Sequence, residues 1–195
     1  SITLGRFRFI DSFQFMAASL DVLVKNTTKF YHTESEIKEN VDLLKQKGVY
    51  PYDYMNSWSK FEETKLPPKS AFYSILNDSD ITTADYLRAK LVWNTFKIKN
   101  MGEYHDLYLK TDVLLLADVF ENFRELCLDY YGLDAAHYFT SPGLAWDAAL
   151  KLSKVKLELL TDPDMFLMVE KGIRGGISVI SNRYSVANNK YMGSS

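Results

Sequence analysis

The sequence predicts a helix-rich α/β or α+β fold, with one strand near its start and one near its end. Apolar residues recur at helical spacing over most of the chain, whereas two short stretches near the ends have the spacing of strands. No repeat or low-complexity stretch interrupts this pattern. The 195 residues correspond to one domain and a small additional piece, because a typical domain has about 150 residues.

The first part of the chain predicts a strand and two helices. Charged and apolar residues alternate over residues 6–10, which is the pattern of a half-buried strand. A helix is expected over 13–26, after capping side chains at Asp11 and Ser12. A second, more polar helix is expected over 34–46, with a buried stripe of Ile37, Val41 and Leu44.

The remaining elements follow an irregular connection. Residues 47–70 lack helical periodicity and contain three prolines, so we expect an ordered, aromatic-rich connection there. Asp80 or Thr82 is expected to cap the next helix, and Asn100 and Gly132 are expected to bound a long one. Helices are therefore expected at about 82–96, 101–131, 141–152 and 162–171. A last strand is expected at Ile177, Val179 and Ile180.

The composition excludes several classes of protein. Hydrophobic residues make up 47% and charged residues 25%, which excludes a disordered tail, a collagen-like repeat or a coiled coil. The apolar runs are too short for a membrane span, so we expect no membrane partner. No signal peptide is recognisable at the start, and the single Cys127 excludes a disulfide framework. We therefore expect an intracellular protein that is not secreted.

Charge is unevenly distributed along the chain. Residues 101–140 contain two basic and eight acidic residues, whereas residues 171–195 contain four basic and no acidic ones. This asymmetry suits a protein that holds metal ions in one place and phosphates in another. The alternative is a solvated helix and a chance cluster of basic residues.

Asp112 is the most informative residue for function. Positions three and four residues away on a helix share a face, and around Asp112 these positions are occupied by Tyr108, Leu109, Leu115 and Leu116. A buried carboxylate is costly, so a divalent metal, an arginine or a set of donors should compensate it. Tyr108 is placed to orient a water beside a metal held by Asp112. The alternative is a tyrosine packed on the core and an aspartate paired with a basic group.

The segment from Tyr104 to Phe120 resembles the third exonuclease motif of family B DNA polymerases, Tyr-x-x-x-Asp on a helix. Three further segments resemble motifs of the protein-primed members of this family, in the family's order. They are Ser12–Met16 for (Ser/Thr)-Leu-x-x-hydrophobic, Lys47–Tyr50 for Lys-x-x-hydrophobic, and Ile173–Gly176 for Tyr-x-Gly-Gly. Phe13 replaces the usual leucine and Ile173 the usual tyrosine. The chain as a whole resembles polymerases of viruses, linear plasmids and virus-like mobile elements.

The resemblance implies a particular part of such a polymerase. Residues 1–170 would be the C-terminal part of an RNase H-like 3′–5′ exonuclease domain, and residues 171–195 the linker and the start of the polymerase palm. The family's first two exonuclease motifs and its palm aspartates are not found in this sequence. The chain is therefore expected to be a fragment that is inactive alone.

The resemblance also assigns catalytic roles. Asp112 would ligate one of two Mg²⁺ or Mn²⁺ ions, since divalent cations of this kind prefer carboxylate oxygens. Tyr108 would position the attacking water, and Lys47 would place its ammonium near the scissile phosphate. For Lys47, a solvated lysine before a glycine turn is the alternative.

Five further residues are implied to contact DNA. Ser12 and Phe13 would touch the single-stranded primer end, the hydroxyl at a phosphate and the ring on a base. A helix cap and a core aromatic are the alternatives for this pair. Arg174, Gly175 and Gly176 would lie close to the phosphate backbone, with a plain helix stop as the alternative.

The implied function is that of a DNA-directed DNA polymerase with proofreading activity. The complete protein would bind template and primer DNA, take dNTPs and replicate DNA from a terminal protein, as a monomer. Its compartment, whether nucleus, mitochondrion or virus, is left open. The competing hypothesis is a catalytically inert helical binding module or a decayed fragment of a mobile element.

Overall fold

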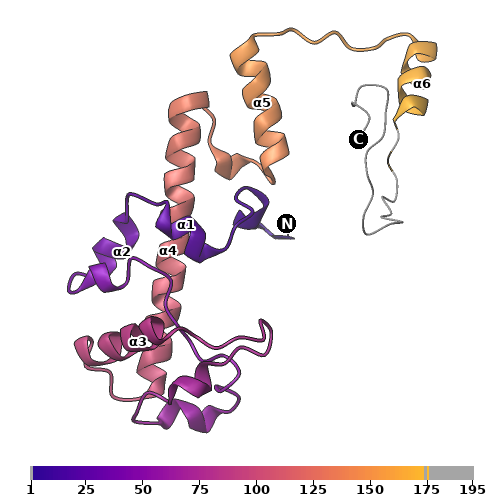
Figure 1. Ribbon diagram of the computed structural model, residues 1–195. Helices are drawn as coiled ribbons and strands as arrows, with labels where there is room; N and C mark the ends of the chain where they lie inside the picture. Colours follow the sequence, from indigo (N-terminus) through magenta and orange to yellow (C-terminus); the bar gives the residue numbers. More distant parts are fainter. Residues whose placement is uncertain (1, 174, 176–195) are drawn as a thin grey trace, which may run out of the picture. The chain divides into compact units, whose positions relative to one another are not determined.

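The computed structural model describes residues 2–173 and 175 (Figure 1). They belong to two compact units, the first ending at Lys154 and the second beginning at Val155. The described residues are rich in helix and contain a small antiparallel sheet, which agrees with the expected α/β or α+β class. The boundary that the family resemblance implies between residues 170 and 171, from the exonuclease region to the linker, stays a prediction.

One long helix, α4 (Met101–Tyr131), forms the axis of the first unit (Figure 1). At 1.5 Å per residue its 31 residues span about 46 Å. Asn100 Oδ1 accepts a hydrogen bond of 2.9 Å from the Glu103 amide and so caps the start. Gly132 ends the helix in the left-handed region, at φ 62°. Both predicted ends are therefore confirmed.

The core of this unit consists of three apolar clusters along α4. The helix contributes residues to each of them, and the other elements dock beside it (Figure 1). The N-terminal cluster of α4 has the buried residues Ile98, Met101 and Tyr104. The middle cluster has Val24, Phe30, Leu115 and Val119. The C-terminal cluster has Phe15, Cys127, Ala135 and Leu144.

Three other helices confirm the expected positions: α3 (Thr83–Thr95), α5 (Ser141–Ser153) and α6 (Pro163–Gly172), of which α6 belongs to the second unit. Thr82 caps α3 and Asp162 caps α6. The connection 47–70 is irregular as expected, apart from the 3-10 turns Trp58–Glu62 and Lys69–Phe72. Among the described helices, none is both long and apolar enough to cross a membrane. The strand expected at 177–180 lies outside the described residues.

The N-terminal strand is part of a hairpin that the sequence analysis recognised only in half. Strand β2 (Phe7–Phe9) lies where a strand was expected, and β1 (Ile2–Leu4) pairs with it antiparallel, with Ile2 opposite Phe9. The expectation that this strand is half-buried is wrong, because every residue of β1 and β2 is exposed. β1 was missed because its alternation covers only three residues, whereas the pattern around β2 extends over residues 6–10. Arg8 anchors the hairpin, since its Nη2 donates to the carbonyl of Ala136 at 3.4 Å.

The expected helix over 13–26 is wrong as a single element. A 3-10 turn (Ser12–Gln14) is followed by an irregular stretch and by helix α1 (Leu20–Lys25), which Ser19 caps. Phe15 is buried in the C-terminal cluster, whereas Val24 is buried in the middle cluster. On one straight helix these two side chains, nine residues apart, would point in opposite directions, so the two could not both face α4.

The expected helix over 34–46 is also wrong. Helix α2 (Tyr31–Glu36) starts earlier and ends where Ile37 becomes extended, at φ -120° and ψ 94°. Asn40, at φ 57°, then precedes a 3-10 turn at Val41–Leu43. The start of α2 is set by Asp118 of α4, whose carboxylate accepts hydrogen bonds from the amides of His32 and Thr33 at 2.7 and 3.0 Å. This cap comes from a distant part of the chain, so local sequence does not reveal it.

Candidate active site

Tyr108 is buried on α4, one turn before Asp112, with 9% of its surface exposed. Its ring stacks on that of Tyr50, with centroids 4.9 Å apart, and its hydroxyl is hydrogen-bonded to that of Tyr52 at 2.5 Å. Burial, followed by the hydrogen bond with Tyr52 and the nearby Asp112 carboxylate, raises the pKa of the Tyr108 phenol. Tyr108 therefore remains a neutral hydroxyl at physiological pH.

Asp112 lies at the border between the core and an exposed apolar surface. Leu115 is fully buried, but Leu109 and Leu116 are 52% and 40% exposed, so the face expected to be apolar and buried is half open. Asp112 Oδ1 is buried without a hydrogen-bond partner, and Asp112 forms no ion pair within the described part of the chain. A buried carboxylate oxygen without a donor is suited to ligate a hard divalent cation.

The segment Lys47–Val49 packs directly against the Tyr108 turn of α4. A Cβ at Gly48 would lie 2.8 Å from Cδ2 of Tyr108, so only glycine permits this approach. The hydroxyl of Tyr104 donates to the carbonyl of Val49 at 2.6 Å. The structure thus brings together two segments, 47–50 and 104–112, that the sequence analysis singled out separately.

Lys47 is partly buried at the edge of this contact. Its carbonyl accepts a hydrogen bond of 2.8 Å from Nη1 of Arg88. Its ammonium has no ion pair with any residue that the structure describes. The positive charge of Lys47 is therefore not neutralised by a described carboxylate.

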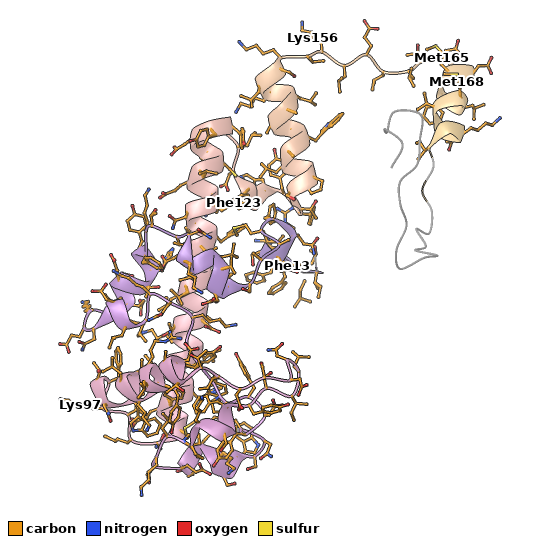
Figure 2. All side chains as sticks on the ribbon, in the orientation of Figure 1. Phe13, Lys97, Phe123, Lys156, Met165 and Met168 are labelled. Carbon is orange, nitrogen blue, oxygen red and sulfur yellow. The ribbon has the colours of Figure 1, made fainter. Side chains whose placement is uncertain are left out.

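Ser12 lies beside α4, one turn beyond Asp112. It lines an apolar groove of about 290 Å³ together with Ile10, Val113, Leu116, Ala117 and Phe120. Asp11 rather than Ser12 is the capping residue here, because Asp11 Oδ1 accepts from the Phe13 amide at 3.0 Å. Phe13 is 55% exposed and is not a core aromatic (Figure 2). The two structural alternatives for this pair are therefore not what the structure shows.

The predicted linker motif is largely outside the described residues. Arg174 and Gly176 are not described, and Gly175 is described without its neighbours. Within residues 2–173 and 175, no three His, Cys, Asp or Glu side chains are grouped as a metal site requires. Asp112 is the one sequence-predicted metal ligand; the 47–50 segment contacts α4 one turn before it, at Tyr108, and Ser12 lies beside α4 one turn after it.

Sequence reasoning missed two side chains at this site, Tyr52 and Arg88. Tyr52 was included only in the aromatic connection, although its alternation with Tyr50 placed both rings on one side of an extended segment. Arg88 carried no signal, because its partner Lys47 lies far away in the sequence. Comparisons of the chain with protein-family models, curated proteins and solved structures gave no match.

Proposed function

We propose that this chain is the later part of the RNase H-like 3′–5′ exonuclease domain of a protein-primed family B DNA polymerase, with the start of the linker to its palm domain. One observation carries the proposal: the segment of α4 that resembles the third exonuclease motif has the two other described motif segments as neighbours. Gly48 contacts the Tyr108 ring, and Ser12 shares a groove with Leu116, one turn beyond Asp112.

Asp112 and Tyr108 have the chemistry that excision requires. Two divalent cations, when bound, stabilise the attacking and leaving oxygens of phosphodiester hydrolysis. The unpartnered Oδ1 of Asp112 would hold one of them. The Tyr108 hydroxyl is neutral at physiological pH, as that of an ordinary tyrosine is, and can donate or accept a hydrogen bond. It would orient the attacking water.

The flanking segments suit the DNA strand. The unneutralised ammonium of Lys47 would lie near the scissile phosphate. The exposed ring of Phe13 would stack on a base of the single-stranded primer end, beside the Ser12 hydroxyl at a phosphate. In the complete polymerase, Arg174, Gly175 and Gly176 would approach the phosphates of template and primer, and dNTPs and a terminal protein would bind elsewhere.

The test compares two aspartates of α4 in the full-length protein. Asp112→Ala should lower metal-dependent 3′–5′ excision at least 100-fold, because the metal loses a ligand, while primer extension stays at the parent level. Asp106→Ala is the matched control, since Asp106 is exposed on the same helix and should leave both activities unchanged.

Excision is measured as release of the 3′ nucleotide from a labelled single-stranded oligonucleotide, and extension on a primed template. Thermal unfolding of each variant establishes that it is folded. Full excision by Asp112→Ala, or an equal loss of excision and extension, would contradict the proposed role of this site.

A further inference from the structure

We infer that Arg88 is a positioning residue of the active site proposed above, and that it acts by holding the Lys47–Val49 segment in place against Tyr108. This inference rests on the proposed function. It assigns a role to α3, a helix that contributes none of the residues implied by the family resemblance.

Arg88 joins two parts of the first unit through separate nitrogens. Nη1 donates to the carbonyl of Lys47 at 2.8 Å, and Nη2 donates to Oδ1 of Asp85 at 3.2 Å. The planar, rigid fork of a guanidinium fixes both directions at once, which a lysine ammonium does not. Only 20% of the Arg88 side chain is exposed, so these bonds are largely shielded from water.

Asp85 is itself held at the start of α3. The hydroxyl of Thr82 donates to Asp85 Oδ2 at 2.7 Å, and the Asp85 amide donates to the same hydroxyl oxygen at 3.0 Å. The Thr82 hydroxyl, followed by Arg88, lowers the pKa of Asp85, which keeps its carboxylate charged. The guanidinium is thus anchored to a rigid helix end and transmits that position to the Lys47 backbone.

Packing alone leaves the segment incompletely fixed on this side. A cavity of about 30 Å³, the volume of about one water molecule, lies among Gly48, Val49, Arg88, Tyr108 and Thr111. The hydroxyl of Thr111, at this cavity, has no hydrogen-bond partner among the described residues. On its α4 side the segment is held by the packing of Gly48 on Tyr108 and by the hydrogen bond from Tyr104 to the Val49 carbonyl. On its α3 side the hydrogen bond from Arg88 ties the Lys47 backbone to α3.

The consequence concerns the Lys47 ammonium. Small displacements of a catalytic group cost rate, because orientation contributes strongly to catalysis. Loss of the Arg88 bond removes the tie between the Lys47 backbone and α3 and lets the ammonium move from its place at the phosphate. We therefore expect Arg88→Ala in the full-length protein to lower kcat for excision roughly tenfold, with KM for the oligonucleotide unchanged.

Lys90→Ala is the matched control, because Lys90 is an exposed basic residue of the same helix whose ammonium lies over the Tyr86 ring. Its excision should equal that of the parent. Arg88→Lys should show an intermediate kcat, because a lysine ammonium reaches only one of the two acceptors at a time. This variant replaces Arg88→Ala in the test if Arg88→Ala does not fold. Thermal unfolding identifies such a case.

A double variant decides whether Arg88 acts through Lys47. In a Lys47→Ala background, Arg88→Ala should cause no further loss of kcat, since the group that it positions is gone. The inference is overturned if Arg88→Ala lowers kcat equally in the parent and in the Lys47→Ala variant. It is also overturned if Arg88→Ala leaves kcat unchanged while Lys47→Ala lowers it. In both cases the proposed function stands. If Lys47→Ala and Asp112→Ala both excise like the parent, the proposed function fails, and the role of Arg88 with it.

Discussion

Asp118 offers a direct test of how α2 is held on α4. Its carboxylate, 1% exposed, accepts three hydrogen bonds: from the His32 amide at 2.7 Å, the Thr33 amide at 3.0 Å and the Thr33 hydroxyl at 2.6 Å. A buried donor left without its acceptor costs about 1–3 kcal/mol, and removal of Asp118 leaves three donors in that state. We expect Asp118→Ala to lower the free energy of unfolding by about 4 kcal/mol.

Asp118→Asn separates the loss of shape from the loss of acceptors. The asparagine keeps one acceptor oxygen but presents an NH₂ group to the remaining donors, so we expect a loss of about 2 kcal/mol. Asp129→Ala is the control, since Asp129 is exposed on the same helix, and it should change the stability by less than about 0.5 kcal/mol.

Equilibrium denaturation followed by far-UV circular dichroism measures these changes. A loss of about 4 kcal/mol corresponds to a decrease in Tm of roughly 10 °C for a protein of this size. Hydrogen exchange at the Thr33 amide of α2 should increase more in Asp118→Ala than exchange at the amides of α4. A loss below about 1 kcal/mol, or equal losses for Asp118→Ala and Asp129→Ala, would refute the reasoning.

Three further predictions concern other parts of the chain. Gly48→Ala should lower the free energy of unfolding by about 1–3 kcal/mol, because the added Cβ would lie 2.8 Å from the Tyr108 ring. Gly143→Ala is the control and should not lower it, because the nearest atom to its Cβ is 3.7 Å away. Equal effects of the two substitutions in denaturation would contradict this. Hydrogen bonds from Arg124 lower the pKa of Asp134 in the folded protein. The Asp134 carboxylate therefore stabilises the fold fully above its pKa in the unfolded chain, which is about 4, and this stabilisation is lost as the pH falls towards the lower pKa of the folded state. The destabilisation by Asp134→Asn should thus shrink below about pH 4, and a constant difference down to pH 2 would be inconsistent with it. Arg174→Ala in the full-length protein should weaken binding to all DNA sequences alike, because phosphate contacts carry no base information. The dependence of log affinity on log salt concentration should become less steep by about one per lost phosphate contact, which a salt titration measures. An unchanged slope and an unchanged affinity would mean that Arg174 is only a solvated residue.

The sequence predicted elements whose signals are local. Helix α4 has its own cap at Asn100 and its own stop at Gly132, so its ends were predictable to the residue. The start of α2 depends on Asp118, which is distant in the sequence. The expected helix over 13–26 had a local cap at Asp11, but that cap starts only a 3-10 turn, and Ser19 caps α1 separately. Tertiary contacts overrode helical periodicity in both places.

The candidate site divides in the same way. Tyr108 and Asp112 were found because both lie on one helix, where spacing alone places them on one face. Their environment was not predictable, because Gly48, Tyr52 and Arg88 reach the site through contacts between segments. Spacing also overestimated the burial around Asp112, since periodicity does not reveal which part of an apolar stripe is covered.

The arrangement of three separate clusters along α4 has a consequence for the order of folding. Contacts within a helix are local and form quickly, whereas the docking of α1 and α2 requires closure of long loops. Because each cluster needs residues of α4, none can condense before the corresponding part of that helix exists. We therefore expect destabilising substitutions within α4 to slow refolding, and those in the docking segments to accelerate unfolding instead.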